Sequence, residues 1–116
     1  MAIGAKLAAP DRPVMAIAGD GGFMFTVQEL ATAAALGLAL PVLVYNNNGY
    51  GEIRESMDHA GIARVGTEFR HDIGGVARGF GCEFCAPASL SEIGDALADA
   101  FAADRPTVIE LTEEIV

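Results

Sequence analysis

The chain has few basic side chains and no long uninterrupted apolar stretch. Its 7 lysine and arginine residues stand against 16 aspartate and glutamate residues, which gives a formal net charge of −9 over 116 residues. Because the basic residues do not cluster, the sequence argues against nonspecific binding to nucleic acid or to an anionic membrane. Gly, Pro or Asn interrupts every apolar stretch well before the roughly 18 residues that a membrane-spanning helix needs.

Cysteine is also scarce. The two cysteines, Cys82 and Cys85, lie among apolar residues and are too few for a disulfide framework, so we expect a reducing, cytoplasmic environment. Their Cys-x-x-Cys spacing is not repeated elsewhere, and we interpret both thiols as buried structural residues. Residues 1–6 contain no basic segment ahead of an apolar core, so a signal peptide is not predicted.

What the chain does contain is a regular alternation of apolar strands and helices. Apolar runs predict a strand buried on both faces of a sheet at residues 14–18 and the next buried strand at 41–45. A last strand is predicted at 107–111, and residues 82–85 are a short strand candidate. Helices are predicted at residues 26–36, 52–57, 72–78 and 89–102, and capping boxes open the first and the last of them. This order predicts one α/β domain with a doubly wound, mostly parallel sheet and helices on both faces.

Two polar clusters follow two of the predicted strands. Gly19-Asp20-Gly21-Gly22 follows residues 14–18, and Asn46-Asn47-Asn48-Gly49 follows residues 41–45. A strand of about five residues rises about 17 Å and a helix of about twelve spans about 18 Å, so both clusters are expected at one edge of the sheet. Open α/β sheets bind ligands at that edge. Asp and Asn oxygens suit Mg²⁺, and glycine lets the backbone approach a phosphate.

Other phosphate-binding motifs do not fit this pattern. A dinucleotide-binding fingerprint would need a small residue where Met24 stands, and no Gly-Lys-Ser/Thr follows the glycines as a P-loop would require. The alternative without a ligand is a capped β-turn at residues 19–22 and an ordinary Asn/Gly loop.

Together the two clusters resemble the diphosphate-binding motif of thiamine diphosphate (ThDP) enzymes, the superfamily of acetolactate synthase and the 2-oxo acid decarboxylases. That motif runs from Gly-Asp-Gly to a downstream Asn-Asn, and the resemblance covers residues 3–57 well and the remainder in outline. It implies that residues 1–116 are a single diphosphate-binding domain from a three-domain enzyme. Residues 3–8, which look like the tail of a helix, favour an N-terminally truncated fragment.

The resemblance also implies a set of ligands for the cofactor. Mg²⁺ would be bound by the Asp20 carboxylate, the Asn47 side chain and the Gly49 carbonyl, with Asn47 chosen over its neighbours on family spacing alone. The residues implied to contact the cofactor are Gly19, Asp20, Gly21, Gly22, Asn47, Gly49, Tyr50, Gly51 and Ile53. Because Asp20 is expected on a loop at the solvent edge, Asp20→Ala should abolish metal-dependent ThDP binding with little loss of stability.

Glu52 is the candidate catalytic residue. The resemblance places it on a short helix facing the thiazolium and the substrate, one position before the working glutamate of some family decarboxylases, where this chain has Ile53. The segment 48–54 resembles decarboxylases of guanidino 2-oxo acids, and a carboxylate pairs strongly with a guanidinium. Glu52 would then line the substrate pocket or act as an acid/base. The alternative is a helix-start glutamate favoured by the helix dipole or paired with Arg54.

The resemblance implies a parent enzyme that decarboxylates a small-molecule 2-oxo acid with ThDP and Mg²⁺. An acetolactate synthase-like carboligase, a transferase, is the sibling alternative. The glutamate that activates the cofactor belongs to another domain in this family, so partner domains and a homo-oligomer are implied, and the isolated chain is expected to turn over nothing. A non-catalytic Mg²⁺-diphosphate binding module and a purely structural α/β domain remain as alternatives from other classes.

Overall fold

A parallel sheet forms the centre of the structure, a computed structural model that describes residues 1–115. Within that range the strands are β1 (Ala16–Gly19), β2 (Pro41–Asn46), β3 (Glu83–Cys85) and β4 (Thr107–Thr112). They lie in the order β1-β2-β4-β3, and each neighbouring pair is parallel. The predicted α/β fold with a mostly parallel sheet is therefore confirmed.

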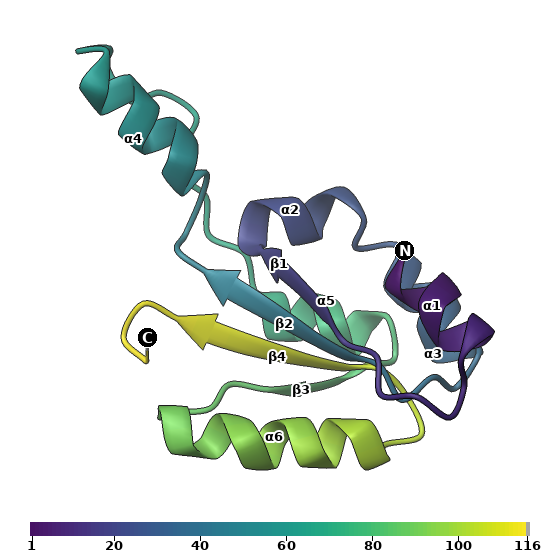
Figure 1. Ribbon diagram of the computed structural model, residues 1–116. Helices are drawn as coiled ribbons and strands as arrows, with labels where there is room; N and C mark the ends of the chain where they lie inside the picture. Colours follow the sequence, from purple (N-terminus) through teal and green to yellow (C-terminus); the bar gives the residue numbers. More distant parts are fainter. Residues whose placement is uncertain (116) are drawn as a thin grey trace.

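Helices cover both faces of this sheet (Figure 1). On one face, Val42, Val44 and Val108 form the main core with residues from the helices and their connections. The helices on this face are α1 (Ala2–Ala8), α2 (Asp20–Phe25), α3 (Glu29–Ala35) and α5 (Ile73–Gly79). On the other face, α6 (Leu90–Ala102) packs through Ala100 against Leu43 and Ile109. Alternate residues of the central strands thus face different helices, because successive side chains of a β-strand point to opposite faces of the sheet.

The first strand differs from its prediction. β1 begins at Ala16, which pairs with Val42, and it lies at an edge of the sheet. Ile17 lies beside Leu43 in the register, yet its side chain is 70% exposed because α6 packs over the central strands and leaves this end of the face uncovered. The prediction that this strand is buried on both faces is therefore wrong for the described chain.

The predicted helix at 26–36 is also corrected. It forms α3, which is shorter at its start, and an additional short helix that the sequence did not predict, α2, begins directly at Asp20. The expected capping box does not form, because Gln28 is the N-cap of α3 and the Glu29 N–H donates to the Thr26 carbonyl at 3.0 Å. Tertiary contacts override the poor helix propensity of Gly21 and Gly22, since Asp20 and Phe23 in the same helix are buried.

Of the two caps predicted later in the chain, the one at Asp72 forms and the one at the start of α6 is shifted. Asp72 caps α5 as expected, because its Oδ1 accepts the Gly75 N–H at 2.7 Å. The box at the start of α6 is shifted by one residue, since Glu92 accepts the Ala88 N–H at 2.9 Å and Ser89 makes no side-chain cap bond. The helix predicted at 52–57 is longer at both ends, and forms α4 (Gly51–His59).

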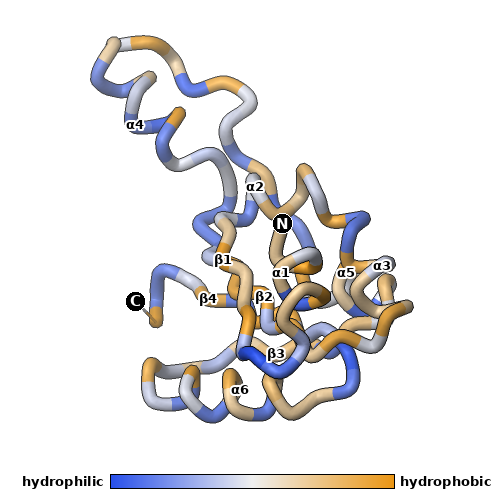
Figure 2. The backbone as a smooth tube through the Cα atoms, turned by 45° about the vertical axis from the view of Figure 1, so that its right-hand side comes forward, coloured by the Kyte–Doolittle hydropathy of each residue, from blue (hydrophilic) through white to orange (hydrophobic). Residues whose placement is uncertain are grey.

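The helix α4 projects from the sheet, as both views show (Figures 1 and 2). It contains no buried residue, and it gives the molecule a long axis of 49 Å against 29 and 24 Å across. Ile62 and Val65, which follow it, are exposed as well. No helix within residues 1–115 has the length and apolar character needed to span a membrane.

Candidate functional site

The Asp20 side chain joins the carboxyl ends of β1 and β2. Only 3% exposed, it accepts the Gly21 N–H through Oδ1 at 2.8 Å and the Gly49 N–H through Oδ2 at 2.9 Å. No lysine or arginine within residues 1–115 forms an ion pair with this carboxylate. A buried anion that is held by backbone donors, and that has lone pairs left, is suited to receive a cation.

The burial of Asp20 corrects one expectation. Asp20 does not lie on a solvent-edge loop but is the first residue of α2, with Gly19 as the N-cap. Its carboxylate satisfies two backbone N–H groups, so its removal would leave buried donors without acceptors. Asp20→Ala must therefore destabilise the domain as well as remove the candidate metal ligand.

The three asparagines after β2 have different environments. Asn46 donates through Nδ2 to Oε1 of Glu110 at 2.6 Å and accepts the Asn48 N–H through Oδ1 at 3.0 Å. Asn48 has φ of +57°, a left-handed conformation that asparagine tolerates better than most residues. Asn47 is half-buried, and none of the hydrogen bonds within residues 1–115 uses its side-chain amide. Its own hydrogen bonds thus occupy the Asn46 amide, and of the other two Asn47 is the half-buried one, since Asn48 is exposed.

Arg54 fixes the backbone of this loop. Its guanidinium donates to the Asn47 carbonyl at 2.9 Å and to the Asn48 carbonyl at 3.2 Å. The suggested pairing of Glu52 with Arg54 is therefore wrong, since none of the ion pairs within residues 1–115 joins them.

Glycine is required at two positions where the chain segments meet. A Cβ on Gly49, whose φ is +144°, would overlap the Thr67 carbonyl oxygen, and one on Gly21 would lie 2.7 Å from Cε1 of Tyr50. The Thr67 carbonyl accepts the Tyr50 N–H at 2.9 Å, and the Thr67 hydroxyl is buried with no hydrogen-bond partner in the described chain. The loop after β2 is thus held between α2 and the segment around Thr67.

The remaining predicted site residues lie at the start of α4. Tyr50 is the N-cap and Gly51 the first helical residue, and a Cβ on Gly51 would overlap the Asn47 amide. The Tyr50 ring meets Phe69 edge to face with 4.9 Å between centroids. Glu52 and Ile53 follow in the first turn and are exposed, Ile53 by 46%. The structure thus groups the predicted cofactor residues other than Ile53 at one sheet edge, while Glu52 and Ile53 lie on the projecting helix.

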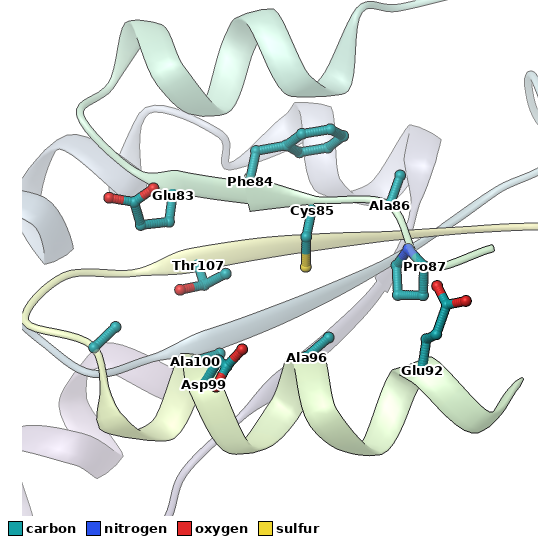
Figure 3. Close-up of a pocket in the computed structure, with 11 residues that line it drawn as sticks. Glu83, Phe84, Cys85, Ala86, Pro87, Glu92, Ala96, Asp99, Ala100 and Thr107 are labelled. Atoms are coloured by element: carbon teal, nitrogen blue, oxygen red, sulfur yellow. The ribbon is translucent and has the colours of Figure 1, made fainter. Parts of the chain in front are cut away.

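A hollow of about 470 Å³ lies between β3 and α6 (Figure 3), and Asp20 is not among the residues that line it. Cys85 points into it from β3, and Glu92 and Asp99 line it from α6. Burial raises the pKa of Cys85, helped by the charge of Asp99, and burial likewise raises the pKa of Cys82. Both thiols are free and are held in the protonated form, which agrees with a structural interpretation and not with a redox pair.

Sequence reasoning missed two residues that shape the site, Glu110 and Thr67. Glu110 carried a signal, since it is a lone carboxylate near the end of an otherwise apolar strand. Thr67 lies in an irregular segment and had no local signal. Within residues 1–115 no cluster of three or more His, Cys, Asp or Glu side chains could hold a metal. Any cation at Asp20 would therefore depend on amide and carbonyl oxygens for its other protein ligands.

Comparisons with known proteins show the family of this chain. Residues 1–111 match the family model "Thiamine pyrophosphate enzyme, C-terminal TPP binding domain". The chain is 43% identical over 111 residues to the "Probable 2-ketoarginine decarboxylase" of Pseudomonas aeruginosa, covering 94% of this chain and 20% of that protein. It is 37% identical over 118 residues to a 3D-(3,5/4)-trihydroxycyclohexane-1,2-dione hydrolase of Bacillus subtilis, covering 94% of this chain and 18% of the hydrolase.

A solved structure is similar over nearly the whole chain. The ThDP-dependent 4-hydroxybenzoylformate decarboxylase of Rhodococcus jostii superposes with a TM-score of 0.88 at 31% identity, covering 99% of this chain and 22% of that one. The chain spans about a fifth of the length of the curated relatives it matches. On the family match and these likenesses, the chain belongs to the thiamine pyrophosphate enzyme family, and it is a C-terminal TPP-binding domain of that family.

Proposed function

We propose that this domain binds Mg²⁺ together with the diphosphate of ThDP, within an enzyme that decarboxylates a 2-oxo acid. The observation that carries the proposal is the buried Asp20 carboxylate, which is joined to Gly49 by a 2.9 Å hydrogen bond and has no cationic side chain as a partner in the described chain. A divalent cation bound between this carboxylate and the diphosphate would offset part of the negative charge of both.

The residues present fit such a cation. Among residues 1–115, Asp20 offers a carboxylate, Asn47 a side-chain amide without a hydrogen bond, and Gly49 a carbonyl that accepts only the Gly51 N–H, at 3.2 Å. The Asn46 amide is engaged by Glu110 and the Asn48 N–H, and Asn48 is exposed whereas Asn47 is half-buried, which supports the choice of Asn47. Gly22 has no atom within 4 Å of the position a Cβ would take, so a diphosphate could approach its backbone.

The cofactor, this domain and the rest of the enzyme would each have a separate role in the reaction. When bound, ThDP supplies the electron sink that decarboxylation of a 2-oxo acid requires. This chain's residues hold the diphosphate end of the cofactor and orient it, and α4 presents Glu52 beside the loop that carries Asn47. The remaining domains of the parent enzyme and a second subunit would supply the other groups, so the isolated chain is expected to release no CO₂ from any 2-oxo acid.

For the substrate we propose a guanidino 2-oxo acid. The relative at 43% identity is named a 2-ketoarginine decarboxylase, and Glu52 is exposed and not paired with Arg54. A carboxylate at the start of α4 would accept two parallel hydrogen bonds from a guanidinium. A pyruvate-specific enzyme would gain nothing from this charge.

The test uses the parent enzyme with saturating Mg²⁺ and ThDP. CO₂ release is measured from pyruvate, benzoylformate, a branched-chain 2-oxo acid and 5-guanidino-2-oxopentanoate, and the guanidino acid should have the highest kcat/KM. Glu52→Gln should lower that value about 10- to 100-fold, as expected for a lost charge-assisted pair. Activity on pyruvate should be unchanged.

Glu55→Gln is the matched control, because Glu55 is exposed on the same helix one turn later. It should change neither activity. Equal losses on both substrates in Glu52→Gln would contradict the guanidinium pairing and favour an acid/base role. Preference for pyruvate with acetolactate as the product would replace the decarboxylase proposal by a carboligase.

A further inference from the structure

We propose that Glu110 is a positioning residue that sets the affinity of the Asp20–Asn47–Gly49 site for Mg²⁺ by fixing the Asn46 amide. This inference rests on the proposed function and deepens it. Glu110 lies on β4, opposite Val44 of the neighbouring strand, two residues before the end of its own strand. It touches no proposed ligand, so its effect must pass through Asn46.

The contact between Glu110 and Asn46 is short and charge-assisted. Asn46 Nδ2 donates to Glu110 Oε1 at 2.6 Å, across 64 positions of sequence, and both residues are half-buried. Hydrogen bonds to an ionised acceptor are stronger than those between neutral groups. The carboxylate therefore dictates which end of the Asn46 amide faces β4.

The other end of the same amide controls the loop. Because Nδ2 faces Glu110, Oδ1 faces the chain and accepts the Asn48 N–H at 3.0 Å. This bond holds Asn48 at φ of +57°, and the next residue, Gly49, turns its N–H to Asp20 Oδ2 at 2.9 Å. A continuous series of contacts thus runs from the end of β4, through the end of β2, to the end of β1.

Asn47 lies between Asn46 and Asn48, the two residues that the bond to Asn46 Oδ1 connects. If the Asn46 amide were free to turn, its NH₂ could face the Asn48 N–H, and two donors would then oppose each other. The loop would have to relax, and the oxygens of Asn47 and Gly49 would no longer be held ready for a cation. Groups that orient metal ligands in this way typically change metal affinity 10- to 100-fold when removed.

The test measures Mg²⁺ affinity and not turnover. Calorimetric titration of Mg²⁺ into the parent enzyme with saturating ThDP should give an apparent Kd about 10- to 100-fold weaker for Glu110→Ala than for wild type. Glu110→Gln keeps an acceptor oxygen for Asn46 and should restore affinity to within about threefold, a rescue that simple loss of charge could not give. Glu113→Ala removes an exposed carboxylate just beyond β4 and should leave affinity unchanged.

A second variant keeps the test decisive if Glu110→Ala fails to fold. Asn46→Ala should weaken Mg²⁺ affinity to the same extent as Glu110→Ala, and the double variant should be no weaker than either single one. Wild-type affinity in Asn46→Ala, or equal losses in Glu110→Gln and Glu110→Ala, would overturn the inference. Failure of the wild-type enzyme to bind ThDP in a Mg²⁺-dependent way would instead overturn the proposed function on which it rests.

Discussion

Asp20→Asn is expected to weaken Mg²⁺-dependent binding of ThDP by at least about 100-fold, because it removes the only carboxylate among the proposed metal ligands. Asn nearly preserves the shape of the side chain and keeps one acceptor oxygen. It cannot accept both the Gly21 and the Gly49 N–H groups, so we also expect a loss of about 1–3 kcal/mol in folding free energy. ThDP binding is measured by calorimetry with and without Mg²⁺, well below the melting temperature.

Asp72→Asn provides the control for this experiment. Asp72 is an exposed N-cap that accepts the Gly75 N–H, and asparagine caps helices about as well as aspartate. The variant should keep both its stability and its ThDP affinity. If Asp20→Asn kept wild-type affinity as well, Asp20 could not be a metal ligand, and the proposed site would have to be abandoned.

Gly49→Ala is expected to have the largest effect on stability. An alanine there would keep a φ of +144° that residues with a Cβ rarely adopt, and the new methyl group would overlap the Thr67 carbonyl oxygen and lie 3.1 Å from the Glu68 Cα. Both neighbours are backbone atoms, so relief requires the loop to move away from Asp20. We expect a loss of about 3 kcal/mol or more, together with loss of Mg²⁺-dependent ThDP binding.

Gly61→Ala separates conformational strain from steric overlap. Gly61 also has a positive φ, of +65°, but nothing lies within 4 Å of the position its Cβ would take. It should lose only about 1 kcal/mol, the cost of a left-handed conformation. Thermal melting of the enzyme should therefore rank wild type above Gly61→Ala and Gly61→Ala well above Gly49→Ala. Equal melting temperatures for the two variants would show that the close approach to Thr67 is unimportant.

The sequence by itself determined the order of the strands and the edge of the sheet at which the polar clusters lie. The apolar runs predicted all four strands of the described chain, and the Asp72 cap predicted the start of α5. These features are local, because a buried strand needs consecutive apolar residues and a cap bonds to N–H groups within one turn. The Gly-Asp-Gly and Asn-Asn motifs, with the spacing between them, are likewise local features of the sequence that indicate the family.

Only the tertiary structure decided how the site is held. The helix that begins at Asp20 runs against local propensity, and it exists because Asp20 and Phe23 are buried against the rest of the fold. The distinction between Asn46 and Asn47 depends on Glu110, which is 64 positions from Asn46 in the sequence and one strand away in the sheet. Contacts between the ends of separate strands leave no periodic pattern in the sequence, so their partners become visible only when parallel pairing brings the strands into register.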